Sequence, residues 1–161
     1  MKCVLYAEDN SDDVTIMRLA FQRAEVGVPL QVVHDGQEAM SYLLGYQQYQ
    51  DRARYPEPRV ILLDLNLPKL SGFEVLQKIR LTPSIARTPV LMLTSSDLQA
   101  DIEKSAALGA DGYLVKPAKL TRLVEMAKAI HNYWLVDENV STGAKRDAAG
   151  FEWETPFRTL R

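Results

Sequence analysis

Short apolar segments recur along the chain, and each is followed by a segment with the periodicity of an amphipathic helix. The segments are too short for buried helices and are rich in β-branched, leucine or aromatic residues, which is typical of buried strands. They occupy residues 4–7, 30–33, 60–63, 90–93 and 113–115. Because strands that alternate with helices pair in parallel, the pattern predicts an α/β domain with helices on both faces of one sheet.

The five predicted helices are delimited mainly by glycines and polar residues. The first begins after Ser11, the second ends near Gly45, the third follows Gly72, the fourth stops at Gly109, and the fifth covers residues 120–134. A domain of this size with five strand–helix repeats suits the flavodoxin-like, doubly wound parallel sheet with strand order 2-1-3-4-5. Strands 1 and 3 are then expected to be neighbours.

Two segments fall outside the repeat. Residues 46–59 form a polar, proline-interrupted link that is long for such a connection, and we expect the second helix to extend into it. Residues 137–161 are mostly polar but contain spaced apolar residues: Phe151, Trp153, Phe157 and Leu160. The alternatives for this extension are a flap that docks on its own domain, a dimer contact and a disordered tail. We therefore expect one domain, residues 1–136, followed by a C-terminal extension, residues 137–161.

The composition argues against several classes of partner. A formal net charge of −2 and a pI of about 5.7 give no general reason to bind nucleic acid or an anionic membrane. One cysteine permits no intrachain disulfide, and with two histidines it is too little for a typical structural zinc site. The N-terminal apolar run is too short for a signal peptide or a membrane span. We expect a cytoplasmic protein.

Polar side chains stand at the carboxyl ends of four predicted strands. Glu8 and Asp9 follow the first strand, Asp64 the third, Thr94 the fourth and Lys116 the fifth. In an open parallel sheet these ends lie along one edge, and the ligand crevice opens where the strand order reverses. The five side chains are therefore expected to meet in one crevice.

This set of side chains indicates phosphoryl chemistry. Two like charges about 4 Å apart repel by roughly 4 kcal/mol at an effective dielectric near 20, so the acids need cations beside them. Lys116 supplies one charge, and an all-oxygen acidic pocket suits Mg²⁺. A carboxylate next to a metal and an amine can act as a nucleophile and become an acyl phosphate. Asp64, on the central third strand, is the predicted phosphoacceptor.

Four fragments, in this order and at the predicted strand ends, resemble the receiver domain of two-component response regulators, the CheY-like fold. They are Glu8-Asp9-Asn10, Leu63-Asp64-Leu65-Asn66-Leu67-Pro68 with Gly72 following, Thr94-Ser95-Ser96, and Tyr113-Leu114-Val115-Lys116-Pro117. The resemblance spans about residues 2–134. It implies that a histidine kinase phosphorylates Asp64, and that Mg²⁺ is held by Glu8, Asp9, Asp64 and the main-chain carbonyl of Asn66.

The same resemblance implies a conformational switch. The Thr94 hydroxyl is expected to move and bond a phosphoryl oxygen, while Lys116 pairs with the phosphoryl group. Tyr113 is expected to swing inward behind Thr94. The bond between Lys116 and Pro117 is expected to be cis, an isomer that proline tolerates.

Finer features resemble small single-domain regulators that are paired with phytochrome-type sensor kinases. These features are the Asp-Leu-Asn-Leu-Pro string, the long link before strand 3, and a fifth helix that ends in Tyr133-Trp134-Leu135. We see no DNA-binding segment, so we expect output through protein contact: a downstream partner, a phosphorelay or self-association. The fifth helix and the aromatic extension favour a homodimer.

Other interpretations compete with this one. The main alternative is a Mg²⁺-dependent phosphatase with an aspartate nucleophile on the same fold, but Asn66 stands where such enzymes commonly place a general acid. A binding module that no longer accepts phosphate has no support in the sequence. Four further acids are interpreted as helix caps or solvated loop residues, not as ligands: Asp12, Asp13, Asp35 and Asp97. Thr94 could cap the fourth helix, although Ser96 or Asp97 would serve better.

Overall fold

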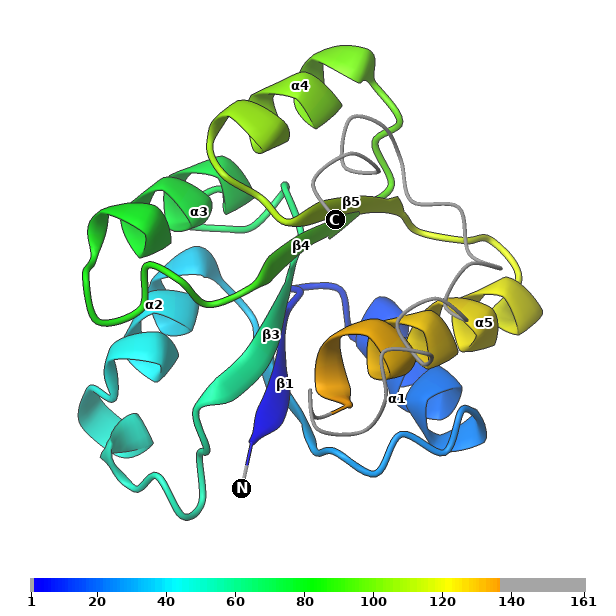
Figure 1. Ribbon diagram of the computed structural model, residues 1–161, viewed down its shortest axis with the longest axis horizontal. Coiled ribbons are helices and arrows are strands. Elements are labelled where there is room, and N and C mark those ends of the chain that lie inside the picture. The colour runs from blue at the N-terminus through cyan, green and yellow to red at the C-terminus, as the bar shows by residue number, and fades with distance from the viewer. Residues whose placement is uncertain (1, 137–161) are drawn as a thin grey trace.

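The computed structural model describes residues 2–136, which form a five-stranded parallel sheet between two layers of helices (Figure 1). The strand order is β2-β1-β3-β4-β5, as predicted. The strands are β1 (Cys3–Ala7), β2 (Leu30–Val33), β3 (Pro58–Leu63), β4 (Val90–Thr94) and β5 (Gly112–Val115). The switch in strand order therefore lies between β1 and β3, the two strands whose carboxyl ends carry the predicted acids.

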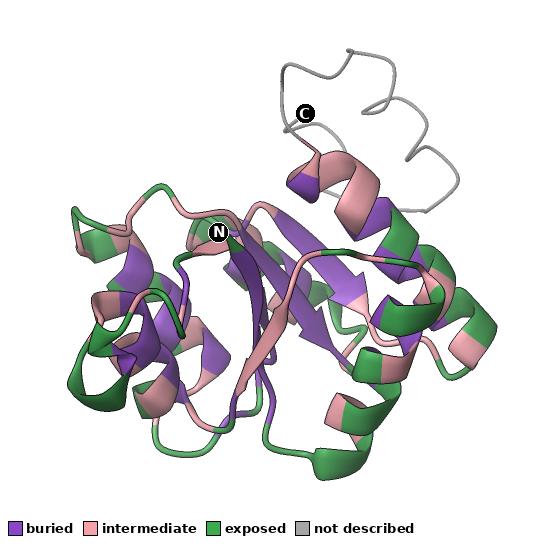
Figure 2. Ribbon diagram, turned by 90° about the horizontal axis from the view of Figure 1, so that it is seen from below, coloured by how far each residue is buried: buried purple, intermediate pink, exposed green. Residues whose placement is uncertain are grey.

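The helices cover both faces of the sheet. On one face lie α1 (Ser11–Arg23) and α5 (Leu120–Ile130), which pack against each other (Figure 1). The other face carries α2 (Gly36–Leu44), α3 (Gly72–Leu81) and α4 (Gln99–Ala107). With helices on both sides, the central strands are buried on both faces, as Figure 2 shows. This explains why the strands are continuous apolar runs with no polar alternation.

Successive side chains of each strand enter the two cores alternately. Leu5 and Ile61 pack beneath α2, α3 and α4, whereas Val4, Tyr6 and Leu62 pack beneath α1 and α5. All five are at most 1% exposed. This alternation follows from the two-residue period of a strand. It fixes the strand register, because a slip by one residue would exchange the two core surfaces.

The second helix does not extend into the link before β3, contrary to the prediction. It ends at Gly45, whose φ of 69° lies in the left-handed region that glycine tolerates. The chain then forms a short 3-10 helix, η1 (Gln47–Gln50). The ring of Tyr49 lies 4.9 Å from the ring of Tyr42 and 5.0 Å from that of Tyr55, measured between centroids. These aromatic contacts anchor the link against the domain.

The fifth helix is shorter than predicted. Regular α5 ends at Ile130, and a π-helical turn, η2 (His131–Leu135), completes it. The Nε–H of Arg59 in β3 donates a hydrogen bond of 3.2 Å to the main-chain oxygen of Trp134. This contact ties the end of the turn to the sheet. The C-terminal extension predicted for residues 137–161 lies outside the described residues.

Helix caps differ from the sequence expectation in two places. Asn10 caps α1, since its side chain accepts from the main-chain N–H groups of Asp12 and Asp13. The fourth helix follows Leu98 and has no side-chain cap, so neither Ser96 nor Asp97 takes that part. Asp35 caps α2, as expected. Within residues 2–136, no helix has both the length and the apolar character that crossing a membrane requires.

Candidate functional site

The strand register brings the predicted site residues to one edge of the sheet. Ala7 of β1 is the register partner of Leu63 of β3, so Glu8 and Asp64 follow on neighbouring strands. The main-chain N–H of Asp64 donates to the Ala7 oxygen at 3.3 Å. On the other side, the N–H of Lys116 donates to the Thr94 oxygen at 2.8 Å. Main-chain pairing therefore brings the strand ends that carry the predicted site residues to one edge, as expected for a parallel sheet.

The ammonium group of Lys116 lies among three carboxyl groups. Its Nζ donates to Glu8 Oε1 at 2.7 Å, to Asp64 Oδ2 at 2.9 Å and to Asp13 Oδ2 at 3.0 Å. These acids come from the end of β1, the end of β3 and the first turn of α1. Lys116 is only 17% exposed, so these interactions are shielded from water. The predicted convergence of Glu8, Asp64 and Lys116 is thus observed.

Burial and hydrogen bonding set different protonation states for the acids. Burial raises the pKa of Glu8 to about 9, and the neighbouring Asp64 and Asp13 carboxyl groups act in the same direction. Burial alone would also raise the pKa of Asp64, but the neighbouring Glu8 carboxyl and the hydrogen bond from Lys116 outweigh it and lower that pKa. Burial and the neighbouring acids thus favour the protonated form of Glu8. Asp64 is a buried, ionised carboxylate, as a nucleophile must be.

Lys116 stays charged because its hydrogen bonds with the acids outweigh the effect of its burial. Burial on its own lowers the pKa of an ammonium group, but the hydrogen bonds with Glu8 and Asp64 outweigh it, so the pKa of Lys116 is raised. The pKa of Asp13 is lowered, first by the neighbouring Glu8 carboxyl, against the opposing effect of burial, and further by the hydrogen bond from Lys116. These shifts thus favour a charged Lys116 beside the ionised carboxylates of Asp13 and Asp64.

The donor set fits a hard divalent cation. Glu8 Oε2 is buried and has no hydrogen-bond partner within residues 2–136, so that oxygen requires a proton or a cation. Asp9, the next residue, is exposed at the mouth of the crevice. All the available ligands are oxygens, the type that Mg²⁺ prefers. Among residues 2–136, no group of three acidic, histidine or cysteine side chains is arranged to hold a metal ion. The Lys116 ammonium lies among the carboxylates instead.

The loop after β3 holds Asp64 by main-chain contacts. The N–H of Asn66 donates to Asp64 Oδ1 at 3.2 Å, which places that peptide group at the site. Gly72, at the start of α3, approaches the same loop: a Cβ there would lie 2.2 Å from the Asp64 main-chain oxygen. Only glycine fits this close approach. A metal-binding role for the Asn66 carbonyl stays a prediction.

Thr94 and Tyr113 both contact the loop that follows β4. The Thr94 hydroxyl oxygen accepts a hydrogen bond of 3.4 Å from the N–H of Ser96, and Tyr113 Oη donates to the Ser96 carbonyl at 2.9 Å. Both side chains are fully buried. The Tyr113 ring is therefore inside the protein in this structure. Switch roles for Thr94 and Tyr113, and a cis bond before Pro117, stay predictions.

Asp13 is a site residue that the sequence interpretation assigned to helix capping. Its carboxylate lies in the first turn of α1, five positions after Glu8, and contacts Lys116 directly. The cap by Asn10 fixes this turn, because both Asp12 and Asp13 donate their N–H groups to it. An available signal was the place of Asp13 in the first turn of a helix that begins directly after the strand-end acids, at the same edge of the sheet.

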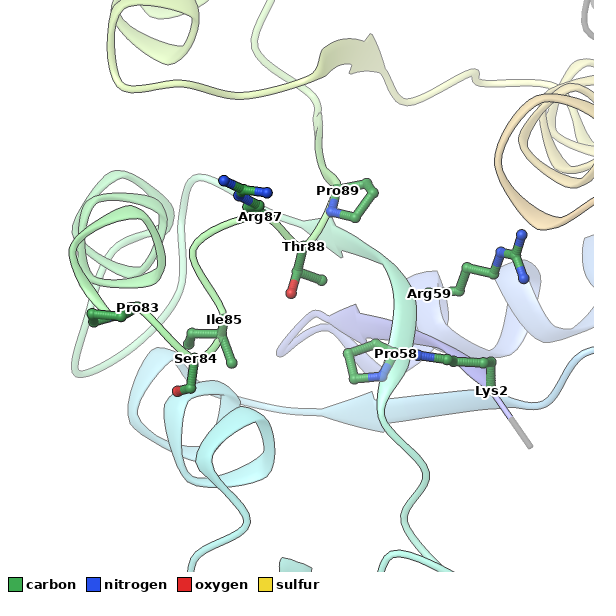
Figure 3. A pocket seen from close by; sticks show the side chains of 9 residues that line it. All are labelled: Lys2, Pro58, Arg59, Pro83, Ser84, Ile85, Arg87, Thr88 and Pro89. Carbon is green, nitrogen blue, oxygen red and sulfur yellow. The ribbon is translucent and has the colours of Figure 1, made fainter. Parts of the chain in front are cut away.

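Hollows lie near both ends of the sheet. One, of about 220 Å³, lies beside the site and is lined by α1, by residues 116–120 and by Leu123. The other, of about 440 Å³, lies at the amino ends of β1, β3 and β4 and contains Lys2, Arg59 and Arg87 (Figure 3). In Figure 3 the guanidinium groups of Arg59 and Arg87 lie on different sides of this hollow and do not converge. The crevice at the carboxyl ends is therefore the chemically organised site.

Comparison with known proteins agrees with this geometry. Response regulator Rcp1 of Synechocystis sp. is 35% identical over 134 residues, which are 83% of this chain and 89% of Rcp1. The structure of its Mn²⁺-bound form has a TM-score of 0.74 and 35% identity, covering 88% of this chain and 98% of that chain.

Two further solved structures are similar over the same region. The phosphorylated cyanobacterial phytochrome response regulator RcpA has a TM-score of 0.76 and 36% identity, covering 87% of this chain and 96% of its own. RPA3017, a response regulator in red light signalling of R. palustris, has a TM-score of 0.80 and 32% identity, covering 88% and 97%. Residues 4–128 match the family model described as the response regulator receiver domain. With these matches and a lysine-bound acidic crevice at the strand ends, the chain belongs to the response regulator receiver domain family.

Proposed function

We propose that Asp64 accepts a phosphoryl group from a histidine kinase and that the protein signals through the resulting change of surface. The observation that carries this proposal is the state of Asp64 itself. Its side chain is 8% exposed, yet its pKa is lowered and Lys116 holds it at 2.9 Å. A buried carboxylate that stays ionised beside a cation is suited to nucleophilic attack on phosphorus.

The transfer exchanges one bond for another. An Asp64 carboxylate oxygen attacks the phosphorus, forming the P–O bond of an acyl phosphate, while the P–N bond to the kinase histidine breaks. The electron pair of that bond returns to the imidazole, which regains a proton. Lys116 lies within hydrogen-bond distance of Asp64, so it can donate to the incoming phosphoryl oxygens.

We assign Mg²⁺ binding to Glu8, Asp9, Asp64 and the Asn66 main-chain carbonyl. A bound Mg²⁺ would neutralise negative charge that builds up on the phosphoryl oxygens. The unpartnered Glu8 Oε2 and the exposed Asp9 support this assignment, and the solved Mn²⁺-bound form of Rcp1 supports a divalent ion in such a protein.

For the switch, we propose that the Thr94 hydroxyl leaves Ser96 and bonds a phosphoryl oxygen, with Lys116 as the second donor. Both Thr94 and Tyr113 are bound to Ser96, so a movement of Thr94 would be passed to the loop before α4. Pro117 would support this geometry through a cis bond with Lys116. To change the active form from 1:99 to 99:1, phosphorylation must favour it by roughly 5.5 kcal/mol.

A phytochrome-type sensor kinase is our proposed partner. Support comes from RcpA, which is described as a cyanobacterial phytochrome response regulator, and from RPA3017, described as acting in red light signalling. The family consists of signalling switches, and Asn66 in place of a general acid disfavours a turnover phosphatase. Slow self-hydrolysis of the acyl phosphate is expected. A cytoplasmic location fits the single cysteine and the kinase partner.

The test is phosphorylation with acetyl phosphate and Mg²⁺, followed by intact mass. Wild type should gain one acid- and base-labile phosphoryl group, and this gain should disappear in Asp64→Asn and on chelation of the metal. Asp97→Asn, an exposed acid in the β4–α4 loop, is the matched control and should behave as wild type. A stable mass gain in Asp64→Asn, or none in wild type, contradicts the proposal.

The kinase assignment needs a separate measurement. Purified phytochrome-type and unrelated histidine kinases, each labelled with ³²P on histidine, should transfer the label at different rates. We expect the phytochrome-type kinase to transfer at least about tenfold faster, a difference of about 1.4 kcal/mol. Equal rates would remove the phytochrome link without affecting phosphorylation at Asp64.

We also propose that the protein forms a homodimer through α5 and the C-terminal extension. The amphipathic α5 and the aromatic residues of the extension motivate this proposal. Light scattering at micromolar concentration, on the full chain and on a chain truncated after Leu135, should show a dimer that the truncation weakens. A monomer for both chains would contradict it.

A further inference from the structure

Lys116 uses all three hydrogens of its ammonium group on carboxyl oxygens, and the three acceptors are not equivalent. Glu8 and Asp64 stand at strand ends, and their side chains are 1% and 8% exposed. Asp13 belongs to a helix, and its side chain is 40% exposed. An ammonium group has three donors and no acceptor, so this arrangement saturates it.

The two strand-end acids have other duties in the proposed function. Glu8 and Asp64 are assigned to the metal, and Asp64 also becomes the acyl phosphate. Each of these events draws oxygens away from Lys116 or places positive charge near it. Asp13 has no such assignment, so its carboxylate is the acceptor that stays available to Lys116 throughout the reaction.

The position of Asp13 is fixed independently of the metal. Its main-chain N–H donates to Asn10 Oδ1 at 3.0 Å, and Asn10 caps the helix. The following helix packs against the sheet through Met17 and Phe21, which are 2% and 4% exposed. The first turn of α1 is therefore a rigid support from which the carboxylate reaches Lys116.

We propose that Asp13 is a positioning residue, which holds the Lys116 ammonium beside Asp64 while a divalent ion and the phosphoryl group take up Glu8 and Asp64. This inference rests on the proposed function, since it assumes that metal and phosphate enter the crevice. Without Asp13, the positive charge of the metal pushes the ammonium toward solvent, because Lys116 then has no dedicated counter-charge.

Asp12 provides a matched control. It is the neighbouring residue in the same first turn, donates its N–H to the same Asn10 Oδ1 at 2.9 Å, and is exposed. Within residues 2–136 its carboxylate forms no ion pair. Substituting either acid by asparagine removes the same charge from the same helix terminus. Only Asp13→Asn removes the contact with Lys116.

The direct test is hydrogen exchange of the Lys116 ammonium group, followed by ¹⁵N NMR of lysine side chains on the full chain. The signal is assigned by its loss in Lys116→Arg. In the presence of Mg²⁺, Asp13→Asn should exchange roughly three- to tenfold faster than wild type, because one charge-assisted hydrogen bond is lost. Asp12→Asn should not differ from wild type, and Asp13→Glu should recover part of the protection. Equal exchange in Asp13→Asn and wild type, or the same increase in Asp12→Asn, would overturn the inference.

Phosphoryl uptake from acetyl phosphate at saturating Mg²⁺ gives the second readout. It should be slower in Asp13→Asn by the same factor and unchanged in Asp12→Asn, while far-ultraviolet circular dichroism shows both variants folded. An unchanged uptake rate in Asp13→Asn overturns the positioning role. If wild type takes up no phosphoryl group, the proposed function fails at that step, whereas the ammonium exchange still decides whether Asp13 holds Lys116.

Discussion

Replacing Gly72 by alanine should damage both the fold and the phosphoryl acceptor through one contact. A Cβ at position 72 would lie 2.2 Å from the main-chain oxygen of Asp64 and 2.8 Å from the Cα of Leu65. The loop would have to move by about 0.8 Å merely to bring the first of these distances to 3.0 Å. Both atoms belong to the backbone that carries Asp64, so no flexible side chain can absorb the overlap.

The expected magnitude follows from this geometry. Overpacking that forces the backbone to shift costs about 1–3 kcal/mol, and the higher helix propensity of alanine offsets at most about 1 kcal/mol of it. We therefore expect a net loss of about 1–2 kcal/mol in the free energy of unfolding. Asp64 lies 2.9 Å from Lys116, and a displacement near 1 Å should slow phosphoryl uptake by about tenfold or more.

Urea unfolding and uptake from acetyl phosphate measure the two effects on the same protein. Gly27→Ala is the control, since Gly27 has no heavy atom within 4 Å of the added Cβ. It should equal or slightly exceed wild type in stability and match it in uptake. If Gly72→Ala unfolds and accepts phosphate as wild type does, the packing argument is refuted.

Three further predictions concern other contacts. Arg80 donates hydrogen bonds to Asp111 and to three main-chain carbonyls, those of Gly109, Ala86 and Thr88, so Arg80→Met should lower the free energy of unfolding by about 1–3 kcal/mol in urea titrations. Arg87 is exposed, and Arg87→Met should change the free energy of unfolding little. The hydrogen bonds with Ser71 lower the pKa of Glu74. Their stabilisation is therefore present above the pKa that Glu74 has in the unfolded chain, and it is lost as the pH falls through the pKa of the folded protein. Glu74→Gln should thus be less stable than wild type at neutral pH, and this difference in stability should vanish in acid. Burial raises the pKa of the Cys3 thiol, so disulfide-exchange reagents should label it only on unfolding, and rapid labelling of the native protein would contradict this.

The residues at strand ends could be predicted because they depend on backbone pairing. Once the alternation indicates a parallel sheet, the register that pairs Ala7 with Leu63 places Glu8 and Asp64 together without reference to side-chain detail. The need for Lys116 follows from charge alone. Sequence reasoning therefore recovered the sheet order and the acid–lysine cluster.

Features set by contacts between distant segments were not predictable in this way. The π-helical turn η2 after α5 is tied to the sheet by Arg59, which is 75 positions from the Trp134 oxygen that it binds. The link after Gly45 is shaped by tilted and edge-to-face contacts among three tyrosines and not by helix propensity. The contact of Asp13 with Lys116 depends on which residue caps α1, and Asn10, Ser11 and Asp12 are all acceptable caps by residue type.

The charge balance of the crevice explains why lysine and metal are both needed. The ionised carboxylates of Asp13 and Asp64 outnumber the one Lys116 ammonium that they contact, so negative charge remains uncompensated even where Glu8 is protonated. A phosphoryl group on Asp64 makes the charge there more negative, about −1.5 to −2, and Lys116 alone cannot balance this charge in a site with so little water. A divalent ion held by Glu8 and Asp9 would supply positive charge that offsets this increase. Lys116 must then remain beside Asp64 against the repulsion of that ion, and the carboxylate placed to keep it there is Asp13, at 3.0 Å.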